Sequence, residues 1–229
     1  MLAESDIAAL WLTLRLAGVT TLILLILGIP FAWWLARTRF RFKVVIESII
    51  ALPLVLPPTV LGFYLLVALG PNGPIGGLSN ALGGPTLAFS FTGLVLGSVL
   101  YSLPFVVQPL QTAFSGIDQH LLEVASTLRA KPLDSFIHVV LPIAKSGVIT
   151  AASLGFAHTL GEFGVVLMIG GNIPHKTQVL SIAIYDHVES LEYGHAHVLS
   201  IGLLIFSFLL LYLIYRNNYK HQFFLRRKG

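Results

Sequence analysis

Five long runs of apolar residues decide most of what this chain can fold into. Their approximate bounds are 10–36, 44–69, 88–114, 145–169 and 195–215. Each is long enough to cross a hydrocarbon core of ~30 Å, which takes about 20 helical residues. Only 10% of the 229 residues are charged, against about 25% in a soluble domain. The sequence therefore predicts an all-α integral membrane protein, a single domain over 1–229 with five transmembrane helices in contact with lipid.

The positions of the basic residues predict how the chain is oriented. Of the 14 Lys and Arg, 12 fall in the loop 37–43, in the polar stretch that runs up to Lys145, and in the tail from Arg216. Cytoplasmic loops are enriched in Lys and Arg, so these regions should be cytoplasmic. Five crossings then place the N-terminus outside and the C-terminus in the cytoplasm. Segment 1–6 is acidic, which is not typical of a cleaved signal peptide.

The two remaining loops are predicted outside. Residues 70–87 are rich in Gly and Pro and uncharged, and residues 170–194 are net acidic. The apolar stretch 179–185 within the second loop is too short to span, and it predicts an interfacial or re-entrant helix.

Prolines interrupt the second apolar run at Pro53, Pro57 and Pro58. Proline removes a backbone donor and kinks a helix. In lipid the freed carbonyl groups need partners, so this segment should pack against protein or line a path. Gly62 would let a neighbouring helix approach closely. A kinked structural helix is the alternative, but we favour a wall of the translocation path with apolar side chains such as Leu54 at its gate.

The fourth run contains the tetrapeptide Gly161–Gly164, with Glu162 as its charged member. At 1.5 Å per residue, Glu162 lies roughly 24 Å along a helix from Ser146, near the outer interface. A carboxylate there would repel an anion. We therefore predict that Gly161, Glu162 and Gly164 belong to a gate or a helix contact rather than to a ligand site.

A polar, helix-prone stretch, 118–142, separates the third and fourth runs. Asp118 is a plausible N-cap, and Pro132 suits the first turn of a second short helix. Apolar residues recur at helical spacing after the cap, at Leu121, Leu122, Ala125 and Leu128. This pattern predicts two short helices that form a compact docking surface with apolar anchors and a charged rim.

This stretch resembles the coupling loop of ABC-importer permease subunits. The residues that match the family pattern at its spacing are Glu123, Ala125, Leu128, Leu141 and Pro142. Arg129 stands where the family has a Gly that lets the chain turn, and a side chain in a left-handed conformation costs about 1 kcal/mol there. Either Arg129 adopts that conformation or Pro132 sets the turn. The proline-rich second run and Gly161–Gly164 look like those of molybdate-type permeases.

The resemblance implies a type I importer fold in the inner or plasma membrane. It also implies a homodimer with the path at the subunit interface, an ATPase dimer docked at the cytoplasmic face, and an oxyanion-binding protein outside. Molybdate is the expected cargo, with tungstate, sulfate or another small solute such as an amino acid as alternatives. The coupling residues implied are Leu121, Glu123, Ala125, Leu128, Arg129, Pro132, Phe136, Leu141 and Pro142.

Several other functions are not supported by the sequence. Without cysteine no disulfide or thiolate chemistry is possible. Segment 170–177 is close to a P-loop but has His175 where Gly must precede the Lys, so ATP hydrolysis is expected on a separate chain. The spacing of His187, His195 and His197 matches no structural zinc site. We therefore predict a non-enzymatic subunit with no cofactor, no metal and no nucleic-acid partner, with an ATPase-independent channel or carrier as the distant alternative.

Overall fold

The computed structural model describes the backbone of residues 4–226, and all regular structure in that range is helical. The side chains of residue 215 and of 217–229, which include most of the predicted basic tail, lie outside the described residues. The helices are α1 (Glu4–Arg37), α2 (Lys43–Val55), α3 (Pro58–Leu69), α4 (Pro74–Ala81), α5 (Phe91–Ser115), α6 (Gln119–Thr127), α7 (Pro132–Ser135), a π-helical turn (Phe136–Val140), α8 (Leu141–Ile143), α9 (Lys145–Leu160), α10 (Gly164–Gly170), α11 (Leu180–Glu189) and α12 (Tyr193–Arg226).

Four described segments are long and apolar enough to cross a membrane, and a bent pair raises the count to five. The four are Glu4–Arg37, Pro58–Ala81, Phe91–Ser115 and Tyr193–Ile214, and the pair joins Pro132–Ile143 to Lys145–Leu160 at 74°. The upper count agrees with the sequence, but the second candidate extends through α4 into the loop predicted at 70–87. Two predicted spans are also not continuous. The second is divided into α2 and α3, and the fourth into α9 and α10.

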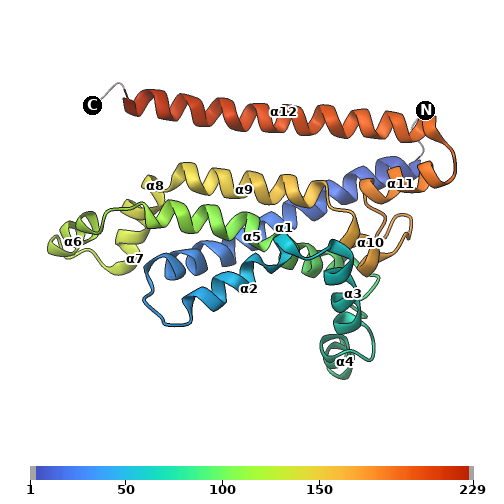
Figure 1. The fold of residues 1–229 in the computed structure, drawn as a ribbon, viewed down its shortest axis with the longest axis horizontal. Coiled ribbons are helices and arrows are strands. Elements are labelled where there is room, and N and C mark those ends of the chain that lie inside the picture. The colour runs from blue at the N-terminus through green and yellow to red at the C-terminus, as the bar shows by residue number, and fades with distance from the viewer. Residues whose placement is uncertain (1–3, 227–229) are drawn as a thin grey trace.

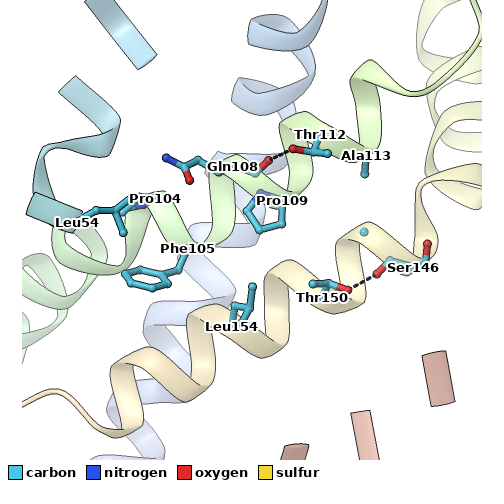
Figure 2. Close-up of a pocket in the computed structure, with 11 residues that line it drawn as sticks. Leu54, Pro104, Phe105, Gln108, Pro109, Thr112, Ala113, Ser146, Thr150 and Leu154 are labelled. Atoms are coloured by element: carbon cyan, nitrogen blue, oxygen red, sulfur yellow. Dashed lines mark hydrogen bonds between the residues drawn. The ribbon is translucent and has the colours of Figure 1, made fainter. Parts of the chain in front are cut away.

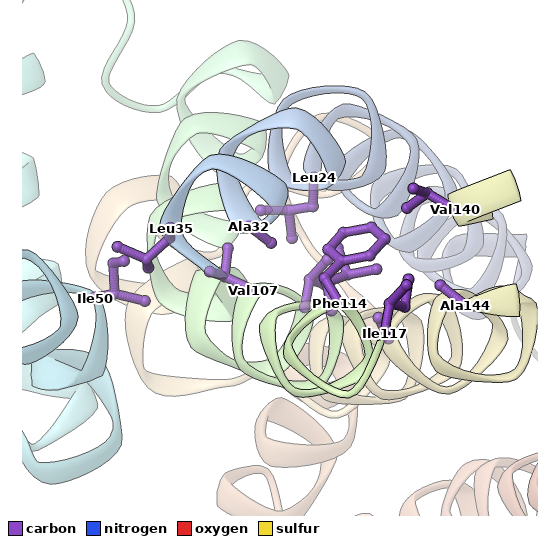
Figure 3. Close-up of a cluster of buried hydrophobic side chains, with 12 residues drawn as sticks. Leu24, Ala32, Leu35, Ile50, Val107, Phe114, Ile117, Val140 and Ala144 are labelled. Atoms are coloured by element: carbon purple, nitrogen blue, oxygen red, sulfur yellow. The ribbon is translucent and has the colours of Figure 1, made fainter. Parts of the chain in front are cut away.

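Helices α1, α5 and α9 pack side by side as the centre of the bundle (Figure 1). Their apolar faces meet in a core in which Leu24, Val107, Leu110 and Phe114 are almost fully buried (Figure 3). Val140, from the π-helical turn, closes one end of this core. The core therefore connects the spans directly to the segment that follows α6 and α7.

The two ends of the bundle carry different elements (Figure 1). Helices α6 and α7, the loop between α1 and α2 and the C-terminal end of α12 lie at one end. Helices α4, α10 and α11 and the N-terminus lie at the other. The basic loop 37–43 and the polar segment with Arg129 and Lys131 thus lie at the same end as the described end of α12, as the charge pattern predicted.

The short apolar stretch in the last loop forms helix α11. Its residues Leu180, Ile182 and Ala183 are buried, and Ala183 belongs to a small core with Ala9 of α1 and Leu199 of α12. Helix α11 is therefore packed between two long helices. By contrast α12 is largely exposed, with only 6% of its apolar window buried within the chain.

Candidate translocation path and coupling surface

The break between α2 and α3 follows from two consecutive prolines. The residue before a proline is driven out of the helical region, and both Leu56 (ψ 136°) and Pro57 (ψ 135°) are extended. Pro58 then starts α3, where its missing N–H is harmless. Pro53 remains inside α2. A complete break, rather than the expected kink, results because two residues in succession are pushed out of the helix.

The break between α9 and α10 lies against the break between α2 and α3. Gly161 to Phe163 are not helical, and α10 begins at Gly164. A Cβ atom added to Gly164 would lie 2.7 Å from the Cβ of Pro58, and one added to Gly62 would lie 2.7 Å from the Cβ of Met168. Both approaches are closer than any side chain permits, so the two glycines allow α3 and α10 to touch.

The two breaks form part of the wall of a cavity of about 620 Å³. Its lining brings together residues that the sequence suggested separately, Pro58 from the second run and Gly161, Glu162 and Gly164 from the fourth, and adds Thr59, Tyr101, Ala157, His158, Phe163, Leu167 and Met168. Irregular backbone at membrane depth is tolerated where it is buried in protein or lines a cavity. Three other residues predicted for the path, Pro53, Pro57 and Gly62, are not among the residues lining this cavity.

Glu162 is buried at this junction, with 5% of its surface exposed. Neither carboxylate oxygen makes a well-formed hydrogen bond among the described residues, although the carboxyl group lies beside the buried Ser98 hydroxyl. The backbone carbonyl of Glu162 accepts a hydrogen bond from Ser181 at 2.5 Å. A buried carboxyl group without a partner is costly, and an ionisable residue within the membrane is by default a functional candidate.

A chain of hydrogen bonds fixes the ring of His158 in the cavity wall. Thr159 donates to the carbonyl of Gly155 at 2.9 Å, so the Ser102 hydroxyl, 2.9 Å from Thr159 Oγ1, must donate to it. Ser102 Oγ then accepts from Nδ1 of His158 at 2.9 Å. The ring also stacks on Phe105, with centroids 3.8 Å apart. This arrangement could not be predicted from the sequence, because its members lie on two helices, α5 and α9.

A second cavity, of about 580 Å³, lies between α5 and α9 (Figure 2). Phe105 lines it, and the stacked His158 lines the first cavity, so this pair of rings stands between the two. The polar lining of this second cavity comes from Gln108, Thr112, Ser146 and Thr150. Its apolar lining includes Leu54 of α2 and Pro104 and Pro109 of α5. The two prolines of α5 could have been recognised in sequence by the argument used for the second run.

The two short helices predicted for the polar stretch 118–142 are present as α6 and α7. Asp118 caps α6 as predicted, accepting a hydrogen bond from the backbone N–H of His120 at 2.9 Å. Arg37 anchors the start of this segment by donating to the carbonyl of Ile117 at 2.8 Å. Six of the predicted coupling residues are exposed, namely Leu121, Glu123, Leu128, Arg129, Pro132 and Pro142. A coherent exposed surface therefore exists at this end of the bundle.

The other three predicted coupling residues face the protein itself. Ala125 is buried, and Leu141 is half-buried. Phe136 packs against Trp33 and Phe114, with ring centroids 5.5 Å and 6.1 Å away. Phe136 thus anchors the segment to the bundle, and it is not an exposed anchor for a partner.

Arg129 sets the turn between α6 and α7. Its φ of 59° is left-handed, and the N–H groups of Arg129 and Ala130 donate to the carbonyls of Ser126 and Ala125. These two hydrogen bonds form a Schellman motif, which usually has Gly at the left-handed position. The sequence left two possibilities, a left-handed Arg129 or a turn set by Pro132. The structure shows the first, in which the Arg129 backbone is strained.

We expect Arg129→Gly to stabilise the protein by about 1 kcal/mol, because it removes a side chain from a left-handed conformation. The measurement is the thermal unfolding midpoint of the purified protein in detergent. Lys131→Gly is the matched control, since Lys131 has an ordinary φ of −68° and gains only flexibility. A lower midpoint for Arg129→Gly than for Lys131→Gly would show that the Arg129 side chain makes a stabilising contact.

Comparisons with known proteins agree with these features. A family model described as a binding-protein-dependent transport system inner membrane component matches residues 28–221. The molybdenum transport system permease protein ModB of Azotobacter vinelandii is 64% identical over 217 residues, covering 95% of this chain and 96% of that protein. A probable sulfate transport system permease protein of Prototheca wickerhamii is 32% identical, covering 96% and 85%.

Solved structures show the same fold at low sequence identity. A bacterial ABC transporter that imports alginate aligns with a TM-score of 0.78 at 16% identity, covering 95% of this chain and 80% of that chain. A methionine ABC transporter in an inward-facing conformation aligns with a TM-score of 0.71 at 17% identity, covering 96% and 99%.

A bundle of apolar helices with broken spans around a cavity, and with short polar helices at one end, defines a multi-pass membrane permease. The chain belongs to the family of binding-protein-dependent transport system inner membrane components. It is therefore a transport subunit and not an enzyme.

Proposed function

We propose that this chain forms the membrane path of an ATP-binding-cassette importer whose cargo is molybdate. The identity of 64% to a molybdenum permease over nearly the full length carries the choice of cargo, because the sulfate permease is only 32% identical. The same machine with tungstate as cargo is the nearest alternative. The membrane is the inner or plasma membrane of the cell.

The path runs along the face formed by α2, α3, α5 and α9. The contact between the two helix breaks supports this proposal, because discontinuous spans are found where membrane transporters handle their cargo. The first cavity lies at the breaks and the second lies beyond the Phe105–His158 ring pair. Pro53, Pro57, Pro58 and Gly62 on one side, with Gly161, Glu162 and Gly164 on the other, form the gate.

A second copy of the chain completes the path in this proposal. Apolar side chains on the α2–α3 segment are exposed, among them Val55 at 84% and Tyr64 at 66%. Lipid or a second copy would cover them, and only the second copy would close the cavities from the side. The oxyanion-binding protein docks at the end that carries α4, α10 and α11, with the N-terminus outside.

The ATPase dimer docks on α6 and α7 at the cytoplasmic end. This assignment rests on the exposed apolar side chains of Leu121 and Leu128 beside the charged Glu123, and on the basic residues that gather at the same end. The cytoplasmic C-terminus follows from the same placement. ATP binding would move the two docking surfaces together, and the core around Phe114 would transmit that movement to the spans.

The test is uptake of molybdate into proteoliposomes that contain the permease and its ATPase, with the binding protein added on one side. We expect molybdate uptake to require both ATP and the binding protein. Tungstate should inhibit this uptake by competition, whereas excess sulfate should leave it nearly unchanged. Uptake without ATP would mean a channel or carrier. ATP-dependent uptake of sulfate in preference to molybdate would overturn the choice of cargo alone.

A further inference from the structure

A cluster of histidine and carboxylate side chains lies at the corner between α11 and α12, at the end opposite the coupling surface. Its members are His187 at the end of α11, Glu192 in the connecting loop and His195 in the first turn of α12. Glu192 Oε2 is 2.9 Å from Nδ1 of His187 and 3.4 Å from Nδ1 of His195. One ligand atom from each of the three residues lies within 4.8 Å of the others.

The backbone holds this corner in a tight and strained turn. The N–H groups of Leu191 and Glu192 donate to the carbonyls of Val188 and His187. This is a second Schellman motif, and its left-handed position is occupied by Leu191 with a φ of 61°. A branched residue is disfavoured there. The turn nevertheless brings Glu192 next to both rings, and strain of this kind concentrates at functional sites.

A fourth residue, from a distant part of the sequence, fixes the orientation of His187. The carboxylate of Asp6 in α1, only 2% exposed, lies 2.9 Å from Nε2 of His187. With Nε2–H donated to Asp6, Nδ1 is the nitrogen turned toward Glu192. Histidines that bind metals characteristically donate their other ring N–H to a carboxylate in this way.

We propose that His187, Glu192 and His195 bind a borderline divalent transition-metal ion such as Zn²⁺, with Asp6 as the positioning residue. Bonds of about 2.0–2.1 Å to a tetrahedral Zn²⁺ place neighbouring ligand atoms about 3.4 Å apart, with water as the fourth ligand. The distance from Glu192 Oε2 to Nδ1 of His195, 3.4 Å, matches that value, and the distance to Nδ1 of His187, 2.9 Å, is shorter. Rotation of the exposed His195 ring would adjust the remaining distance between the two histidines. Imidazole and carboxylate ligands suit this class of metal.

A metal at this corner would join three elements. Helix α12 has few contacts with the rest of the chain, and the ion would tie its first turn to α11 and, through Asp6, to the start of α1. Its role would be structural, independent of the cargo and of the proposed path. Without a metal, the same side chains form a cluster in which the hydrogen bond to Asp6 raises the pKa of His187, although burial works against it. A proton would therefore compete with the metal ion for Nδ1 of His187.

The experiment uses the full chain in detergent with no histidine tag, treated with a chelator and dialysed at mildly alkaline pH. Titration with Co²⁺ should give the visible absorption of a tetrahedral site at one ion per chain, and Zn²⁺ should displace the Co²⁺ and raise the thermal unfolding midpoint. Glu192→Gln and His195→Ala should abolish both effects. Asp6→Asn should weaken binding by 10- to 100-fold, as for other residues that orient a metal ligand.

His175→Ala and His197→Ala are the matched controls, because both histidines are exposed and lie outside the cluster. They should bind the metal as the unmodified chain does. Absence of stoichiometric binding in the unmodified chain would overturn the proposal and leave a proton-linked cluster. Binding that survives Glu192→Gln and His195→Ala, or that is lost in either control, would overturn it as well.

Discussion

Replacing Leu128 with Asp is expected to abolish copurification of the ATPase and to reduce ATP-driven uptake at least tenfold. Leu128 lies at the C-terminal end of α6 with 78% of its surface exposed. Burying a leucine side chain in a contact is worth about 1.5–3 kcal/mol, and about 1.4 kcal/mol changes an affinity tenfold. The aspartate would also place an unpaired charge in the contact. Copurification and uptake in proteoliposomes are the two measurements.

Leu82→Asp is the matched control for this prediction. Leu82 is equally exposed, at 79%, but follows α4 at the opposite end of the bundle. The same substitution there should leave ATPase binding unchanged. If Leu128→Asp copurifies the ATPase as well as Leu82→Asp does, then the ATPase does not dock on this surface, and the assignment of the cytoplasmic end loses its main support.

Replacing Gly164 with Val is expected to eliminate uptake while the ATPase still binds. Any Cβ at this position would lie 2.7 Å from the Cβ of Pro58, whose ring cannot move aside. Overpacking of this kind typically costs about 1–3 kcal/mol. Helices α3 and α10 would be forced apart where the two breaks meet. Uptake, copurification of the ATPase and the thermal midpoint should be measured on the same preparation.

Gly202→Val provides the control, because a Cβ there meets nothing within 4 Å. It should leave uptake and the thermal midpoint close to those of the unmodified chain. A second pair of variants separates local overpacking from general misfolding. Gly164→Ala adds the same Cβ and should also reduce uptake. Adding Pro58→Gly to it should partly restore uptake, since this removes the atoms in conflict. Normal uptake by Gly164→Val would show that the contact of the breaks is not part of the gate.

The sequence by itself determined the membrane class, the all-helical fold and the two short helices between the third and fourth apolar runs. Apolar runs of spanning length have few other stable states, because backbone groups in lipid must be paired within a helix. The Asp118 cap was also predictable, since capping depends on neighbouring residues, whereas the sequence left the turn open between Arg129 and Pro132.

Only the tertiary structure decided which of these parts lie together. The sequence suggested Pro58 and Gly164 separately, but their contact depends on how α3 packs on α10. Likewise Phe136 was expected to face a partner and instead packs on Trp33 and Phe114. The sequence did not indicate the proposed metal cluster either, because the contact between His187 and Asp6 joins residues from opposite ends of the chain. Local rules fix helices and turns, whereas contacts between distant segments depend on the packing of the whole bundle.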